Sequence, residues 1–159
     1  ARASIGISYN KNTDVGNEYA IIGFGLRYGE PYQRADLQVT SINLIDIGNV
    51  NQQQGALFQW RLVLNPTIVG TIPTPTNVGK ASQMWDYGQA VTITGGYDLT
   101  GGYCQGTLQN ATLTALNFLN MGSNIDYTSA DFVVLAVKLL AGGSYNSSVL
   151  AQLDFQEDL

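Results

Sequence analysis

The sequence predicts an all-β protein, an antiparallel β-sandwich of roughly eight to ten strands that forms a single domain over residues 1–159. Three observations predict this class. Apolar residues recur with a period of two, no window of ten or more residues keeps a helical spacing, and 18 glycines separate short runs. An apolar content of 45% is enough for one domain with its own core.

The first three runs alternate between apolar and small or polar residues. In residues 4–9, the side chains of Ile5, Ile7 and Tyr9 are predicted to share a face. In residues 20–28, one face is predicted to carry Ala20, Ile22, Phe24, Leu26 and Tyr28. The opposite face then holds Gly23 and Gly25, and residues 37–47 form a third strand.

A fourth strand is predicted over residues 57–64, with Phe58, Trp60, Leu62 and Leu64 on one face. Its rich apolar side indicates a central strand with Trp60 in the core. Asn65-Pro66 ends it, because proline donates no ladder hydrogen bond and restricts the preceding residue.

The second half of the chain is predicted to continue with short strands and glycine turns. Residues 73–88 lack a sustained period and form the longest predicted loop, and 115–121 is the best candidate for one helical turn. Turns are expected at Gly95-Gly96, Gly101-Gly102 and Gly142-Gly143. Further strands are expected at 67–72, 90–94, 103–116, 132–140 and 149–155, the last two as a closing hairpin.

The run at 132–140 is apolar on both faces, unlike an ordinary surface strand. We expect it either in the centre of the sandwich or against another subunit. The residues of this possible core or oligomer strand are Phe132, Val133, Val134, Leu135 and Val137. It is much shorter than the roughly 18 residues that span a bilayer, so no membrane segment is expected.

Composition excludes several classes of function. Only 12% of residues are charged, 12 acidic residues outnumber 7 basic ones, and no basic cluster exists, so a nucleic-acid groove is disfavoured. The chain has no histidine, which removes the usual general base and the commonest metal ligand. Cys104 is the single cysteine, and we expect it to be structural. We therefore expect no enzyme, no catalytic residue, no cofactor and no metal.

Two groups of residues could bind a ligand, and each could instead have a purely structural role. Asp126 and Asp131 could approach one another as calcium ligands, but we expect them to cap turns and begin a strand. Trp85, Asp86 and Tyr87 form an aromatic and acidic segment that, if exposed, would contact a glycan or a protein partner. The alternative that we favour is that Trp85 folds back to cover the open end of the sandwich.

The last third of the chain resembles the C-terminal end of tailed-phage virion structural proteins, among them head-decoration and fibre-tip proteins. The shared pattern is the turn Ser123-Asn124-Ile125-Asp126, the apolar run at 132–138, a Gly/Ser/Asn loop and the alternating run at 150–157. The resemblance implies a jelly-roll-like sandwich, usually a trimer, without catalytic residues.

Two functions from different classes follow. The first is a non-enzymatic structural protein of a bacteriophage virion, a homo-oligomer (trimer favoured) that decorates the capsid or forms an appendage beside other virion proteins. The second is a secreted, extracellular glycan-binding module that uses Trp85, Asp86 and Tyr87.

Overall fold

The computed structural model describes residues 2–9, 18–27, 36–46, 57–87, 91–105, 107–112, 131–141 and 147–158. These residues form twelve β-strands and no helix. The strands are β1 (Arg2–Tyr9), β2 (Glu18–Leu26), β3 (Asp36–Asp46), β4 (Leu57–Leu64), β5 (Thr67–Val69), β6 (Thr76–Asn77), β7 (Ser82–Asp86), β8 (Thr92–Thr94), β9 (Tyr97–Gln105), β10 (Thr107–Thr112), β11 (Phe132–Ala141) and β12 (Ser147–Asp158).

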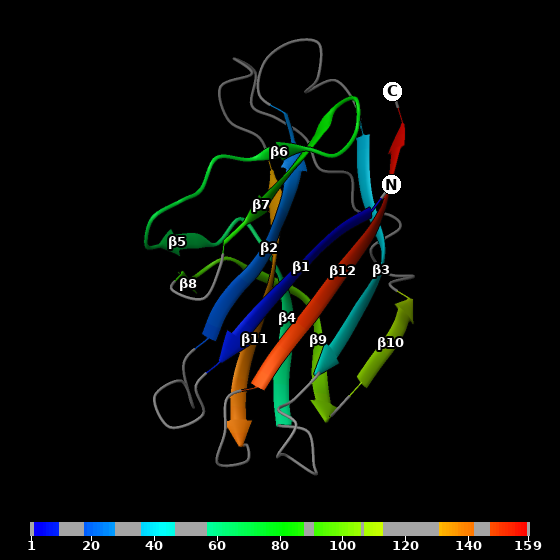
Figure 1. Cartoon of the computed structure of the whole chain (residues 1–159). Helices are drawn as coiled ribbons and strands as arrows, with labels where there is room; N and C mark the ends of the chain where they lie inside the picture. The colour runs from blue at the N-terminus through cyan, green and yellow to red at the C-terminus, as the bar shows by residue number, and fades with distance from the viewer. Residues whose placement is uncertain are drawn as a thin grey trace.

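The strands build two antiparallel sheets that lie one on the other (Figure 1). The small sheet has four strands in the order β1-β12-β3-β10. The large sheet has eight strands in the order β5-β8-β2-β11-β4-β9, and β7 joins it by pairing with β2 and with β6. The predicted all-β sandwich is therefore confirmed, with twelve strands in the described residues where roughly eight to ten were expected.

Eight of the strands follow a jelly-roll order. The chain alternates between the sheets from β1 to β4, stays in the large sheet for β9, and alternates again from β10 to β12. This arrangement gives two interleaved four-stranded sets, β1-β12-β3-β10 and β2-β11-β4-β9, as in double-sheet jelly rolls.

The predicted closing hairpin is wrong. The strand β11 pairs with β2 and β4 in the large sheet, whereas β12 pairs with β1 and β3 in the small sheet. The two runs have the right strand pattern, but their partners come from the first half of the chain. Alternation predicts that a segment is extended and carries no information about which strand lies beside it.

An insertion between β4 and β9 holds the four remaining strands. It carries β5, β6, β7 and β8 and reaches the far side of β2, where β7 pairs with residues 22–26 and β8 pairs at Tyr19 (Figure 1). The prediction of one long loop over 73–88 is wrong, because β6 and β7 lie inside it. The short run at 67–72 does form a strand, β5.

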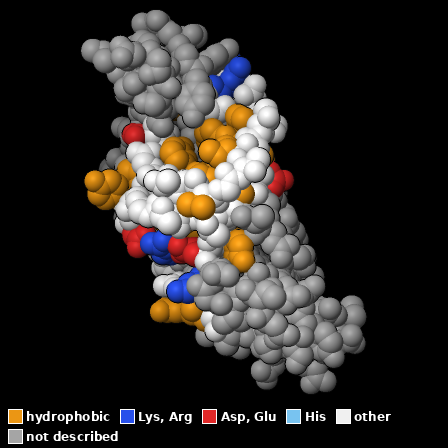
Figure 2. All heavy atoms as spheres, turned by 90° about the vertical axis from the view of Figure 1, so that its left-hand side faces the viewer, with side chains coloured by type: hydrophobic (Ala, Val, Ile, Leu, Met, Phe, Trp, Pro, Cys, Tyr) orange, Lys and Arg blue, Asp and Glu red, His pale blue; other side chains and the backbone are white. Residues whose placement is uncertain are grey.

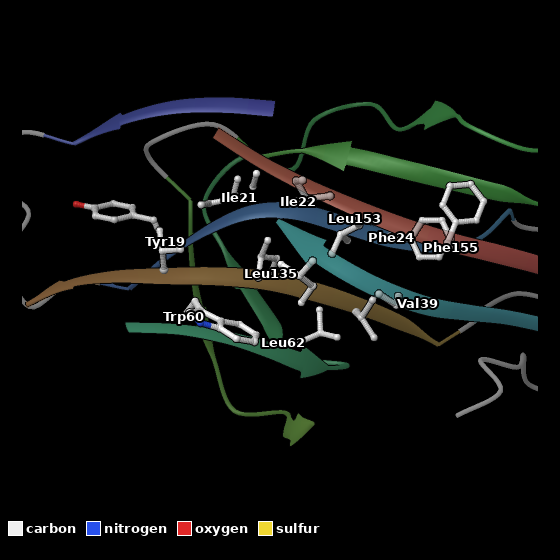
Figure 3. Packing of buried hydrophobic residues seen from close by; sticks show 14 of the residues in the cluster. Tyr19, Ile21, Ile22, Phe24, Val39, Trp60, Leu62, Leu135, Leu153 and Phe155 are labelled. Carbon is white, nitrogen blue, oxygen red and sulfur yellow. The ribbon is translucent and has the colours of Figure 1, made fainter. Parts of the chain in front are cut away.

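The first core lies between the two sheets (Figure 3). The large sheet contributes Phe24 from β2, Leu62 from β4 and Leu135 from β11. Val39 from β3 and Leu153 from β12 meet them from the small sheet. Trp60 is buried in this core as predicted, at 5% exposure. Because residues of both sheets bury apolar area here, this core holds the sandwich together.

A second core lies on the other face of the large sheet. Trp85, Tyr87, Val91 and Ile93 from the insertion pack there against Ala20, Val63, Val134 and Ala136. The strand β11 therefore has Leu135 in the first core and Val134 in the second, and its own chain buries it on both faces. This placement explains why its sequence is apolar throughout.

A bulge in β2 places Ala20 on the face opposite to the one that the sequence predicts. Ile22 pairs with Leu135 and Ala20 pairs with Ala136, so Ile21 is the extra residue between them. Ala20 consequently lies in the second core, opposite to Ile22. Beyond the bulge Gly23 makes room for the buried Tyr87, because a Cβ there would lie 2.4 Å from the Tyr87 hydroxyl oxygen.

Asn65 forms the corner at which β4 ends. Its φ of 51° is left-handed, and its side chain bridges to the start of β11. The amide nitrogen donates to Asp131 Oδ1 at 2.9 Å, and the amide oxygen accepts from the Phe132 backbone N–H at 3.0 Å. Asp131 therefore lies directly before β11, next to the strand start that was expected for it, while Asp126 lies outside the described residues.

The glycine pairs have two different roles. Gly95 and Gly96 form the predicted turn with positive φ values of 68° and 82°. Gly101 and Gly102 are not a turn, because they lie inside β9. The predicted long strand at 103–116 is also divided, between β9 in the large sheet and β10 in the small one. The predicted helical turn at 115–121 and the pair at 142–143 lie outside the described residues.

Candidate functional site

The structure does not support the predicted contact segment at Trp85, Asp86 and Tyr87. Both rings are 6% exposed, and the Trp85 ring lies 6.0 Å from the Phe132 ring, centroid to centroid. They are buried because the outer face of β2 and β11 needs apolar cover. Trp85 thus covers a sheet face and not the open end of the sandwich, and of the three residues only Asp86 is exposed.

The five residues of the possible core or oligomer strand lie inside one chain. Val133, Val134, Leu135 and Val137 are fully buried, and Phe132 is partly buried against the second core. The strand has β2 on one side and β4 on the other. Residues 133–137 therefore offer neither a face nor an edge to another subunit.

An open hollow of about 410 Å³ lies along β4 and β9. Residues 59–61 of β4 and 98–103 of β9 line it, and β9 is the last strand at this edge of the large sheet. Its middle lies at Gly101 and Gly102, which pair with Arg61 and Trp60. A Cβ at Gly101 would lie against the backbone of β4 and one at Gly102 against the Trp60 ring, so the two glycines let β9 lie close to β4 at this point.

A charged network lies at one side of this hollow. Arg61 Nε and Nη2 donate to the two carboxylate oxygens of Glu18 at 2.7 and 2.5 Å. Arg61 Nη1 donates to Asp98 Oδ1 at 2.5 Å. The side chains of Arg61 and Glu18 are 27% and 17% exposed, whereas that of Asp98 is 60% exposed. The network joins β2, β4 and β9 across the large sheet.

The hydrogen bonds that Arg61 donates to Glu18 raise the pKa of Arg61 above its ordinary, already high value, with smaller contributions from the two nearby negative charges. Desolvation opposes this shift. Because this pKa is raised, the stability that charged Arg61 contributes to the fold is fully present below the ordinary pKa of arginine and is lost only as the pH rises above it. The guanidinium therefore stays charged across the pH range in which proteins are handled, and Arg61 is a fixed positive point beside the hollow.

Two aromatic residues complete the lining. Tyr103 is 68% exposed, so its ring is available to solvent at the hollow. Trp60 lies in the core below, and its Nε1 has no acceptor within hydrogen-bonding distance among the described residues. A Cβ at Gly102 would lie 3.2 Å from this nitrogen, so β9 covers it closely.

Sequence reasoning missed Arg61, Asp98 and Tyr103 as a group. One signal was present: Arg61 is the only charged residue in the strand at 57–64, on the same predicted face as Val63. A charge on a face that is mostly covered requires a partner. The sequence alone does not show which residues pair with Arg61, because Glu18 and Asp98 lie 43 and 37 residues away in the chain.

Comparisons of this chain with protein-family models, with curated proteins and with solved structures found no match. Within the described ranges, no cluster of three or more histidine, cysteine or acidic side chains is placed to hold a metal ion. The same part of the chain contains no helix that is long and apolar enough to cross a membrane. The fold and the hollow define a jelly-roll-like β-sandwich with an inserted layer on its large sheet.

Proposed function

We propose that this chain is a non-enzymatic structural subunit of a bacteriophage virion, where it decorates the capsid or forms part of an appendage. It assembles as a homo-oligomer, in which a trimer is favoured, and contacts other virion proteins. The jelly-roll order supports this proposal, because viral capsid proteins are one of the main users of that order. The resemblance of residues 119–157 to virion structural proteins points to the same function.

The observation that carries assembly is an apolar surface on the insertion. Val69 and Ile72 are 48% and 56% exposed; Val69 is the last residue of β5, at the edge of the large sheet, and Ile72 lies three residues further along the chain. Figure 2 shows that hydrophobic side chains gather in the middle of this face among mostly uncharged atoms. A poorly charged surface with large apolar side chains is typical of a contact between subunits. We assign this contact to a second copy of the chain.

The mass of the protein in solution tests this proposal. Light scattering behind a sizing column is expected to give a stable multiple of 17.1 kDa, with three times that mass favoured. The double variant Val69→Asp/Ile72→Asp is expected to weaken association by about tenfold or more, because each new carboxylate would need to be desolvated in the contact. Thr94→Asp is the single-charge control, since it adds one of the two carboxylates at an exposed position of β8.

Two results would contradict the proposal. A wild-type chain that is monomeric at every concentration would overturn assembly as a property of this protein. An unchanged oligomer from the folded double variant would place the contact elsewhere than on Val69 and Ile72. Circular dichroism of each variant establishes that the sandwich itself is intact.

The alternative function, a secreted glycan-binding module, was predicted from a segment whose two aromatic side chains are buried. Trp85 and Tyr87 are core residues, so neither ring is available for stacking against a sugar. Their burial leaves glycan recognition through this segment without an aromatic surface.

A further inference from the structure

We propose that the hollow along β4 and β9 is a binding site for a neutral sugar. In this site Tyr103 stacks on the apolar face of the sugar ring. The sugar hydroxyl groups form hydrogen bonds with Asp98, Arg61 and Gln59. The volume of about 410 Å³ falls in the range of small-ligand sites. The inference is independent of the proposed assembly, which rests on Val69 and Ile72 at the other edge of the sheet.

The glycine pair lets the edge strand β9 lie close to β4 beside the hollow. A Cβ at Gly101 would lie 2.6 Å from the Trp60 carbonyl oxygen, so β9 could not keep this path with a larger residue. Glycine inside a strand often marks a place where a ligand approaches the backbone. Here Gly101 is exposed and lines the hollow together with Tyr103 and Asp98.

The charges of the site favour a neutral ligand with several hydroxyl groups. One arginine is bonded to two carboxylates, and Lys138 lies directly opposite Glu18 and Gln59 on the neighbouring strands, so the formal charges around the hollow balance and attract neither an anion nor a cation. Within the described part of the chain, three of the five guanidinium N–H groups are used, which leaves two donors. Asp98 is largely exposed and accepts hydrogen bonds. Neighbouring hydroxyls of a sugar can donate to this carboxylate and accept from the guanidinium.

Tyr103 supplies the apolar contact. A sugar ring has a C–H face that packs on an aromatic ring, and Tyr103 presents such a ring at the end of the hollow. A tyrosine has only two side-chain torsions to order, so fixing it against a ligand costs little entropy. The site thus combines one stacking ring with fixed polar groups.

A strand from another protein fits this edge less well than a sugar does. The pairing of β9 with β4 shifts register between Leu62 and Val63, which places Leu99 in a bulge beside the hollow. Bulges and paired glycines interrupt the regular ladder that an added strand needs. We therefore assign the hollow to a small ring-shaped ligand.

The test is a glycan array of neutral and acidic glycans, followed by calorimetric titration of the wild type with the neutral sugar that gives the strongest signal. Tyr103→Ala is expected to weaken binding by about tenfold or more. Tyr97→Ala is the matched control, because Tyr97 is an exposed tyrosine of the same strand outside the hollow and its loss should leave affinity within about twofold. NMR spectra should show shifts of the Gly101 and Gly102 amide signals on addition of the sugar.

Three results would overturn this inference. They are an array without signal for any neutral glycan, a signal confined to acidic glycans, and equal affinity of wild type and Tyr103→Ala. The solution mass of Tyr103→Ala separates this inference from the proposed function. A fall in mass without any glycan signal would assign Tyr103 to contact between subunits and overturn the sugar site.

Discussion

Replacement of Leu135 with aspartate is expected to abolish folding. Leu135 is fully buried in the first core, in the middle of β11, with β2 and β4 on either side. The variant loses the packing of a leucine and places a carboxylate where neither water nor a cation reaches it. The expected loss is about 5 kcal/mol or more, which is comparable with the total stability of a small domain. Circular dichroism and urea unfolding measure the outcome.

The conservative variant Leu135→Met separates the effect of charge from that of any change at this position. It keeps the apolar character and nearly the volume, so a cost below about 1.5 kcal/mol is expected. A soluble Leu135→Asp protein with a wild-type unfolding midpoint would show that β11 does not occupy the interior.

Replacement of Phe24 with alanine is expected to lower the free energy of unfolding by about 3–5 kcal/mol. Phe24 is fully buried and joins the two sheets, because its ring on β2 lies 4.4 Å from the Phe155 ring on β12, centroid to centroid (Figure 3). Its removal leaves a cavity between the sheets that neighbouring strands cannot fill. Urea unfolding of the variant and of wild type gives the difference.

A double-mutant cycle with Phe155→Ala tests the contact between the sheets. We expect a coupling of about 0.5–1.5 kcal/mol between the two rings. Tyr97→Ala is the surface control, and at 74% exposure its expected change is within about 0.5 kcal/mol. Additive effects of Phe24→Ala and Phe155→Ala would contradict direct contact of the rings.

The sequence predicts the strands well and their partners poorly. Alternation identifies β2, β4 and β12, and a continuous apolar run identifies β11, because the first three patterns fit strands with one apolar face and the last fits a strand covered on both faces. Pairing is set by contacts between residues far apart in the chain. The predicted hairpin of β11 and β12 is wrong for this reason, and the bulge at Ile21 moves Ala20 to a face that strict alternation does not predict.

The candidate site was beyond prediction from sequence for the same physical reason. Arg61, Asp98 and Tyr103 come together only because β9 returns beside β4 after the insertion. Trp85 and Tyr87 attract attention in the sequence as aromatic residues beside Asp86. The structure uses their rings to cover β2 and β11, a role that depends on where the insertion crosses the sheet.

The central claim is that one chain covers both faces of β11 by itself, so that assembly uses another surface. Amide hydrogen exchange tests this claim directly when it is measured on the wild type and on Val69→Asp/Ile72→Asp. Residues 133–137 of β11 are expected to exchange only by global unfolding in both proteins, more slowly than the edge strand β9. Loss of this protection in the dissociated variant would contradict the claim, because it would show that a partner subunit covers β11.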